Sequence, residues 1–257
     1  MTDPGSPPAP DTGGVLELFD EPSRWRAEII TDFRLRGAER CAAASPTPGF
    51  PQLLDSLMEA LADAPGQWLD VGGGLGGVAS WIERTTAHPV VVADASLASL
   101  RAAQHLFPTL DLVGSDAAAL PVRDRAVSVA IVSGVISLLA EVRPLLSELR
   151  RVVGDDGRIA LTDLWSAGPS TWADHPNTFW SLEELEREAS EHGFQFCHVA
   201  VADLSAGWWP LAARQVSDEV TRRHAAHPAY ERWRADIDHL DEVLGAGRVI
   251  PAAVLLR

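Results

Sequence analysis

The sequence of 257 residues contains no lysine, so all 21 of its basic residues are arginines. This absence excludes chemistry that depends on a lysine Schiff base or a lysine general base. Acidic residues outnumber basic ones, and the formal net charge is −15. Such a surface argues against nucleic acid or an anionic membrane as the main partner, because both would be repelled. The composition therefore favours a small molecule as the partner.

Cysteine is scarce and long apolar runs are missing. The two cysteines, Cys41 and Cys197, lie far apart without the spacing of a metal site, which fits reduced thiols in a cytoplasm. The histidines show no ligand spacing either, so we expect no metal. No run reaches the roughly 18 apolar residues of a membrane span, and the first residues do not resemble a signal peptide. We therefore expect a cytoplasmic protein without a membrane partner, either a monomer or a homodimer.

Residues 68–77 read Trp-Leu-Asp-Val-Gly-Gly-Gly-Leu-Gly-Gly and are the most informative stretch of the chain. An apolar run leads into a cluster of glycines, and an amphipathic stretch follows. This order predicts a buried parallel strand, a tight turn and a helix whose free N–H groups face a ligand. Glycine is needed where the backbone turns with positive φ or closely approaches a ligand. We therefore predict a ligand-binding loop at this position.

The glycines alone leave two ligands open. Gly72, Gly74 and Gly77 fit the dinucleotide pattern G-x-G-x-x-G, and Asp94 lies near the distance expected of a ribose-binding acid. Residues 70–76 also resemble motif I, D-x-G-x-G-x-G, of the class I methyltransferases that use S-adenosyl-L-methionine (SAM). The choice between a dinucleotide and SAM depends on the rest of the chain.

Strand and helix patterns alternate from Trp68 onward, which implies a parallel sheet. Before this point, we predict a helix that starts at Asp20, with Pro22 in its first turn, and a second helix from about Pro51 to Leu61. A capping box at residues 181–184 opens a later helix, and a long helical region precedes the last strand. Strands are expected at 68–71, 88–94, 110–113, 127–132, 158–163, 194–202 and 249–257.

Two later blocks make the resemblance specific. Residues 112–127 are similar to the G-D-A-x-x-L-P-F-x-D-x-x-F region of small-molecule methyltransferases, and residues 148–163 are similar to their E-x-x-R-V-L-x-P-G-G-x-L-x-x-x-D block. With motif I and Asp94 they give four matches in the right order over residues 67–165. Nicotinamide dehydrogenases carry no such pair of blocks. The sequence thus resembles the class I SAM-dependent methyltransferases, in the natural-product subfamily that is similar to methyltransferase type 11.

The resemblance implies an α/β fold. Its doubly wound, seven-stranded, mostly parallel sheet has an antiparallel last strand, with helices before the sheet and a helical insertion before that strand. We divide the chain into a disordered tail (1–14) and one domain (15–257), with a helical lid (15–66), a SAM-binding core (67–165) and an acceptor side with the final strands (166–257). Pro251 departs from the pattern because it would remove a ladder hydrogen bond from a central strand. A bulge, or a strand that starts only at Ala252, would accommodate it.

By resemblance, the chain contacts the nucleoside of SAM with residues at the ends of three strands. Asp94 is expected to accept hydrogen bonds from the ribose hydroxyls. Asp116, with the backbone of Ala117, is expected to hold the adenine. Ser133, at the end of the fourth strand, is expected to line the same site.

The methionine end of SAM is expected along the glycine turn. By resemblance it lies against Gly72, Gly74 and Gly76. Asp70 has two open roles, because it either helps to hold the amino group or only fixes the turn.

Methyl transfer is an in-line displacement on an activated sulfonium, so holding the acceptor close and aligned supplies much of the rate. A base is needed only when the attacking group must lose a proton. Many related O-methyltransferases have a histidine after the fourth strand, but residues 133–139 contain none, which puts a simple histidine-assisted O-methylation in doubt. The candidate bases are Asp163, at the end of the fifth strand, and His175 in the loop that follows.

Aromatic residues gather on the side of the chain where the family builds its acceptor pocket. Five tryptophans follow the fifth strand, at positions 165, 172, 180, 208 and 209. They predict a large apolar or aromatic acceptor, with at least two of them lining the pocket; Trp25 and Phe33 are candidates for lid contacts. Two other readings stay open: a protein that keeps the SAM fold but catalyses a cyclisation or isomerisation without methyl transfer, and a dinucleotide oxidoreductase.

Overall fold

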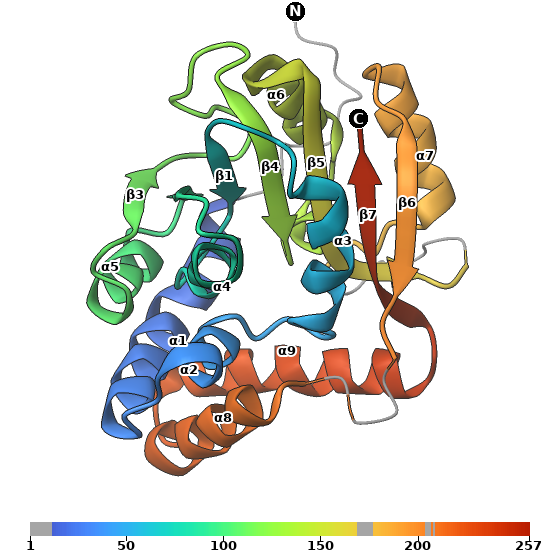
Figure 1. Ribbon diagram of the computed structural model, residues 1–257. Helices are drawn as coiled ribbons and strands as arrows, with labels where there is room; N and C mark the ends of the chain where they lie inside the picture. The colour runs from blue at the N-terminus through green and yellow to red at the C-terminus, as the bar shows by residue number, and fades with distance from the viewer. Residues whose placement is uncertain (1–11, 169–176, 204–206, 208) are drawn as a thin grey trace, which may run out of the picture.

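The structure, a computed structural model, describes residues 12–168, 177–203, 207 and 209–257. Its centre is a seven-stranded sheet in the order β3-β2-β1-β4-β5-β7-β6 (Figure 1). The strands are β1 (Trp68–Val71), β2 (Val90–Asp94), β3 (Asp111–Gly114), β4 (Val127–Ser133), β5 (Val153–Ser166), β6 (Phe196–Val201) and β7 (Val249–Leu256). Only β7 runs antiparallel to its neighbours, between β5 and β6. The predicted fold is confirmed.

Helices cover both faces of the sheet because successive residues of its strands point to opposite sides. Trp68 packs on one face, in a core with α3 (Gln52–Leu61), α4 (Gly77–Thr86) and α5 (Leu97–Leu106). Leu69 and Val71 pack on the other face, in a core with α6 (Arg143–Val152) and α7 (Leu182–Glu191). The predicted capping box is present at the start of α7. The sheet is therefore doubly wound, as expected.

Four further helices form a layer below the carboxyl ends of the parallel strands (Figure 1). They are α1 (Thr12–Asp32), α2 (Gly37–Ala44), α8 (Leu211–His224) and α9 (Pro228–Gly245), and together we call them the cap layer. Trp25 of α1 stacks on His224 of α8 with ring centroids 4.5 Å apart. Trp25 is therefore buried inside the cap layer, whereas Phe33 is exposed. Segments from the two ends of the chain thus cover one edge of the sheet.

The first helix starts earlier than its sequence signals indicate. We predicted a start at Asp20, but α1 begins at Thr12 and continues through Pro22. Residues 12–14, predicted to belong to the tail, are therefore helical. A proline inside a helix removes one hydrogen bond and crowds the preceding turn. For this reason the sequence favours a helix that starts close to Pro22. The cost of Pro22 nevertheless does not interrupt α1.

No helix in the described part of the chain is both long and apolar enough to cross a membrane.

Strand β5 is also longer than predicted. It was expected at residues 158–163, but it pairs with β4 first through Val153 and then again from Arg158 onward. Residues 154–157 form a wide irregularity between these two pairings. Their sequence, Gly-Asp-Asp-Gly, predicts a break between helix and strand. It interrupts the ladder without ending the strand.

Pro251 lies within the central strand β7, opposite Leu164 of β5. Its carbonyl accepts a hydrogen bond from the amide of Ala202, so it faces the β6 side. The nitrogen and carbonyl of one residue in an extended strand point to the same side. The missing N–H of Pro251 therefore also faces β6, which has ended at Val201, and the ladder with β5 loses nothing. Both expected explanations, a bulge in β7 and a start at Ala252, were wrong.

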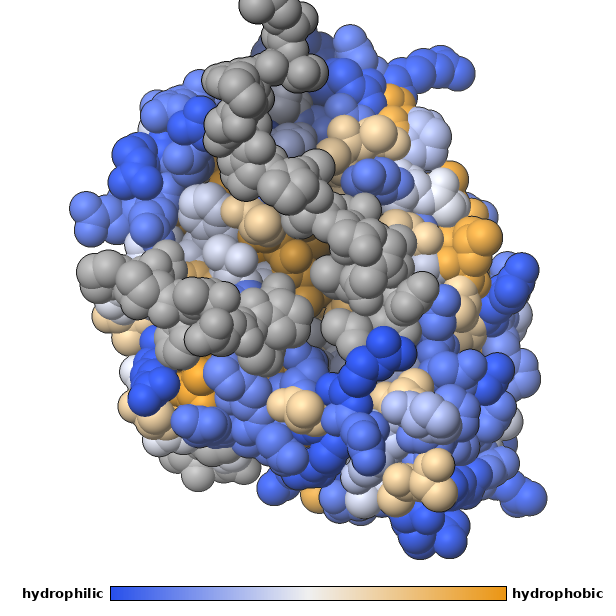
Figure 2. Space-filling model, turned by 180° about the vertical axis from the view of Figure 1, so that it is seen from behind, coloured by the Kyte–Doolittle hydropathy of each residue, from blue (hydrophilic) through white to orange (hydrophobic). Residues whose placement is uncertain are grey.

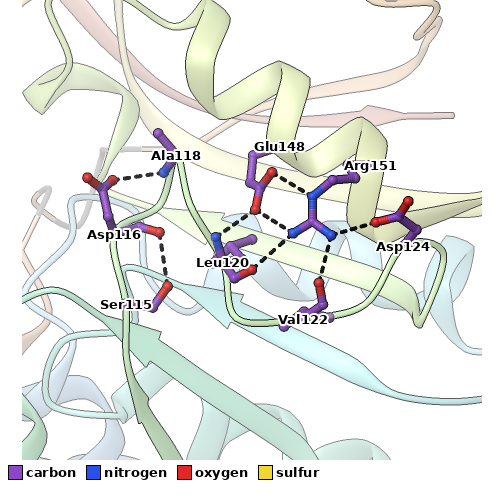
Figure 3. Close-up of polar contacts among 8 residues, drawn as sticks. All are labelled: Ser115, Asp116, Ala118, Leu120, Val122, Asp124, Glu148 and Arg151. Atoms are coloured by element: carbon purple, nitrogen blue, oxygen red, sulfur yellow. Dashed lines mark hydrogen bonds and ion pairs between the residues drawn. The ribbon is translucent and has the colours of Figure 1, made fainter.

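A clamp on α6 holds the loop between β3 and β4. Glu148 accepts the amide of Leu120 at 2.6 Å and pairs with Arg151 (Figure 3). The Arg151 guanidinium donates to the carbonyls of Leu120 and Val122, at 2.9 and 2.7 Å, and to the Asp124 carboxylate. The two residues lie three positions apart on one helix, so both side chains reach the same loop. We call this set of contacts the loop clamp.

Loss of the loop clamp should destabilise the protein measurably. We expect Arg151→Ala to lower the free energy of unfolding by about 2 kcal/mol, because hydrogen bonds to a charged group are lost and two carbonyls need new partners. Urea unfolding followed by circular dichroism measures this difference. Arg123→Ala is the matched control, since Arg123 is an exposed arginine of the same loop, and its change should stay within about 0.5 kcal/mol. Equal losses in the two variants would contradict the clamp.

Candidate functional site

The glycine turn joins β1 to α4 at the carboxyl edge of the sheet. Gly72, Gly74 and Gly76 all have positive φ, at 70°, 53° and 78°. A Cβ built on Gly74 would meet no atom within 4 Å, so the outer side of the turn faces open space. The helix α4 starts directly behind the turn, and its first N–H groups have no side-chain cap. The predicted strand, tight turn and helix are therefore present, with open space beside Gly74.

Asp94 lies at the end of β2 beside this turn. Its Oδ2 accepts the amide of Gly74 and its Oδ1 accepts the amide of Ser96, both at 2.8 Å. Burial raises the pKa of the Asp94 carboxyl, and these two amides oppose the shift. Each carboxylate oxygen can accept more than one hydrogen bond. The two amides therefore fix the orientation of Asp94 and leave each oxygen able to accept from a vicinal diol.

Asp70 is fully buried under the same turn. A Cβ on Gly73 would lie 2.6 Å from Asp70 Oδ2, so only a glycine fits over this carboxylate. Neither oxygen has a hydrogen-bond partner of acceptable geometry. Burial and then the charge of Asp94 raise the pKa of Asp70 to about 7, against the smaller effect of the nearby Ala79 amide. An unpartnered carboxylate at this place would gain from a cation bound close to the turn.

The charges around the turn decide which ligands it can hold. A dinucleotide places its diphosphate against such a turn, where the buried carboxylate of Asp70 would repel it. A ligand with a positive charge would be attracted by both carboxylates. The geometry of the glycines suits either ligand, but the electrostatics favours the cation.

Asp116 follows β3, next to Asp94 in space. The amide of Ser115 donates to the carbonyl of Asp94 at 2.9 Å, which links the ends of β2 and β3. The side chain of Asp116 is exposed, and its Oδ1 accepts the amide of Ala118 at 2.8 Å (Figure 3). Ala117 lies between them and is half-buried. The structure thus brings Asp94, Asp116 and Ala117 to one edge, and the loop clamp holds the segment that follows them.

Ser133 is the last residue of β4, whereas Asp163 lies inside the adjacent strand β5, which continues to Ser166 and so beyond its predicted end at residue 163. Thr162 donates its hydroxyl to Ser133 Oγ at 2.8 Å, so Ser133 is tied to β5. Asp163 is buried, and its oxygens accept the amides of Ser137, at 3.2 Å, and of Leu164, at 2.7 Å. Burial raises the pKa of Asp163, and the hydrogen bonds from Ser137 oppose the shift. This geometry favours a structural role for Asp163 over its predicted role as a base.

Sequence reasoning missed the partner of Asp163. Ser137 belongs to the 3-10 helix η1 (Ile136–Leu138). This helix lies in the segment that lacks the histidine found in many related O-methyltransferases. Its carbonyl also accepts the amide of Thr178, so it ties the chain that precedes α7. The signal was available, because Ser137 is the first polar residue after Ser133. The other candidate base, His175, lies outside the described residues.

The late tryptophans have different environments. Trp165 is fully buried in the core and donates its indole N–H to the carbonyl of Ala252 at 2.9 Å. Trp165 is therefore not among the tryptophans that could line a pocket. Trp180 and Trp209 are half-buried and donate to the Leu139 carbonyl and the Asp241 carboxylate, at 3.1 and 2.7 Å. Trp172 and Trp208 lie outside the described residues.

The surface of the molecule is largely hydrophilic, as its charge suggests. On the face opposite to that of Figure 1, hydrophobic surface gathers in a hollow near the middle (Figure 2). Among the described residues, no three histidine, cysteine or acidic side chains are grouped so that they could hold a metal ion.

Solved structures with a similar fold are numerous, although no curated protein sequence matches this chain. The [4+2]-cyclase SpnF is 19% identical with a TM-score of 0.74, and the match covers 97% of each chain. A SAM-dependent methyltransferase from Thiobacillus denitrificans, in complex with S-adenosyl-L-homocysteine, is 20% identical with a TM-score of 0.62 over 86% of this chain and 96% of the other. Geranyl diphosphate C-methyltransferase from Streptomyces coelicolor A3(2) is 16% identical with a TM-score of 0.53 over 80% of each chain. At these identities the likeness concerns the fold.

The sequence itself matches a family model. Residues 69–161 fit the model described as a methyltransferase domain. The match begins in β1 and ends in β5, and so spans the glycine turn, Asp94, Asp116 and the loop clamp. Residues 69–161 are thus similar to a methyltransferase domain, and the rest of the chain lies outside this match.

Proposed function

We propose that the protein transfers a methyl group from SAM to a small, apolar or aromatic natural-product acceptor. The observation that carries this proposal is the pair of carboxylates at the glycine turn. SAM offers a sulfonium and an ammonium group to Asp70 and a ribose diol to Asp94, whereas NAD would bring a diphosphate to the same place. The family match of residues 69–161 supports the same cofactor.

Each part of SAM then has its own residues. The ribose hydroxyls donate to Asp94, whose orientation is fixed by Gly74 and Ser96. The adenine lies near Asp116 and Ala117. The methionine end lies against Gly72, Gly74 and Gly76, with the charge of its ammonium group close to Asp70. Ser133 lines the remaining side, at the end of β4.

The chain contributes to the reaction mainly by position. The sulfonium of SAM is already activated, so the protein has to hold the acceptor in line with the methyl group and exclude water. In this proposal the cap layer covers the cofactor and acceptor side, which gives residues 15–66 the role of a lid and residues 166–257 that of an acceptor-binding region. Asp163 holds η1 in place. A base is then required only if the attacking atom carries a proton that must leave.

The nature of the acceptor rests on fewer observations. The hydrophobic hollow of Figure 2 and the half-buried Trp180 and Trp209 support an apolar or aromatic molecule. Geranyl diphosphate C-methyltransferase, which has a similar fold, acts on an acceptor with an apolar chain. The atom that receives the methyl group follows from neither observation.

A second candidate function is a cyclisation or isomerisation without methyl transfer. The likeness to the [4+2]-cyclase SpnF supports it, because the match extends over 97% of both chains and so includes the cap layer. A protein of this kind would bind SAM with the same residues. The two candidates therefore differ in what happens to the methyl group and agree on the cofactor.

Cofactor binding tests the part that both candidates share. We expect SAM and S-adenosyl-L-homocysteine, but not NAD, to raise the melting temperature, since a ligand at ~100 times its Kd adds roughly 2.7 kcal/mol. Asp94→Asn should weaken binding about 30-fold or more, because hydrogen bonds to a charged group are lost. Asp111→Asn, an exposed residue on β3, is the control. Stabilisation by NAD alone would overturn the proposal.

The fate of the methyl group separates the two candidates. During turnover of a candidate acceptor, we expect one S-adenosyl-L-homocysteine to be released for each product molecule, with the product heavier by one methylene unit. Mass spectrometry of both products measures this ratio. A product of unchanged mass with intact SAM would establish the second candidate in place of the first.

Asp70 should make cofactor affinity depend on pH. Its pKa is about 7 in the free protein, so below neutrality its carboxyl is protonated and must lose that proton when the cationic cofactor binds. Affinity for SAM should therefore rise as pH increases through about 7 and level off above it. Titration calorimetry across this range measures the change. In experiments with the Asp70→Asn variant the ligand ionises as before, but the carboxyl of residue 70 is absent, so this rise in affinity should be missing. An identical pH profile in both proteins would contradict the assignment of the rise to Asp70.

A further inference from the structure

We propose that Asp20 of α1 is a positioning residue of the cofactor site, which acts on Asp94 through Ser96. The inference rests on the proposed role of Asp94 as the ribose acceptor. It concerns a residue outside the matched domain, because Asp20 lies 49 positions before residue 69. The sequence suggested only that Asp20 starts a helix, a role that the structure does not give it.

Three hydrogen bonds connect Asp20 to the glycine turn. Ser96 donates its hydroxyl to Asp20 Oδ1 at 2.9 Å and its amide to Asp94 Oδ1 at 2.8 Å. Asp94 Oδ2 in turn accepts the amide of Gly74 at 2.8 Å. Ser96 is buried, and Asp20 reaches it from an exposed position on α1. The path therefore runs without interruption from the cap layer to the turn.

The hydroxyl of Ser96 explains why Asp20 matters for the ligand. Ser96 is the N-cap of α5, and for that role its oxygen only has to accept the amide of Ser99, at 3.0 Å. The proton of the same hydroxyl still needs an acceptor. Without Asp20, the Asp94 carboxylate is a competing acceptor, because its Oδ1 already binds the amide of Ser96. Asp20 accepts the hydrogen bond from this hydroxyl. The oxygens of Asp94 therefore remain able to accept hydrogen bonds from the ribose hydroxyls.

A second contact between the same helices provides a control. Ser23, one turn after Asp20 on α1, bonds Ser99, one turn after Ser96 on α5, with their hydroxyl oxygens 2.9 Å apart. Both serines are buried. This contact also holds α1 against α5, but it has no hydrogen bond to Asp94. Removing it loosens the two helices without changing the acceptors offered to the ribose.

The experiment compares Asp20→Ala with Ser23→Ala. Binding of S-adenosyl-L-homocysteine is measured by titration calorimetry at a temperature where both variants are folded, and thermal unfolding without ligand gives their stability. Asp20→Ala should weaken binding about tenfold, whereas Ser23→Ala should change it less than about twofold even where its melting temperature falls as far. Asp20→Asn keeps an acceptor oxygen for Ser96 and should restore most of the affinity.

A variant of Ser96 tests the path itself. In a Ser96→Ala background the hydroxyl proton is gone, so Asp20→Ala should cause no additional loss of affinity. Independent losses in the two variants would overturn the inference, as would unchanged affinity in Asp20→Ala or equal weakening by Ser23→Ala. Binding of S-adenosyl-L-homocysteine to the unaltered protein distinguishes failure of this inference from failure of the proposed function. If it does not bind S-adenosyl-L-homocysteine at all, the proposed function itself is wrong.

Discussion

Asp70 carries a carboxylate into the protein where β1 ends, and the glycine turn is folded directly over it. The side chain is fully buried, its oxygens lack partners, and its pKa is raised to about 7. Only a residue without a Cβ fits above it, at Gly73. The turn therefore has two properties that belong together: a backbone open to a ligand at Gly74 and a negative charge close below. Without a positively charged ligand, this carboxyl holds its proton up to a pH of about 7.

The position of the turn also explains how distant parts of the chain meet at one site. Parallel strands end at the same edge of the sheet, so Asp94, Asp116 and Ser133 come from three strands to one side. The cap layer lies below that edge and contains helices from both ends of the chain (Figure 1). Asp20 and Ser96 connect it to Asp94 beside the turn. In the proposed function, the matched domain supplies the cofactor-binding edge, and the residues outside it close that edge.

Sequence reasoning succeeded where local chemistry determines the result. Buried strands, the glycine turn and the capping box of α7 each follow from a few adjacent residues, and the antiparallel last strand followed from the resemblance. It failed where a distant partner decides. Pro251 is harmless only because β6 ends before its missing N–H would be needed. The start of α1 and the role of Asp20 depend on helices that follow much later.

The loop clamp shows why two separate sequence blocks are informative only together. The Leu-Pro segment at residue 120 and the Glu-x-x-Arg segment at residue 148 are each short and common in type. In the structure they are one contact, because Glu148 and Arg151, both on α6, bind the backbone of Leu120 and Val122 (Figure 3). Backbone contacts do not depend on the side chains of the loop, so the loop can vary while the acidic and basic partners stay. A dinucleotide-binding chain has no need of this loop after its third strand. The pair of blocks thus separates the two ligands that the glycines left open, and the carboxylates at the turn provide the physical reason for the same choice.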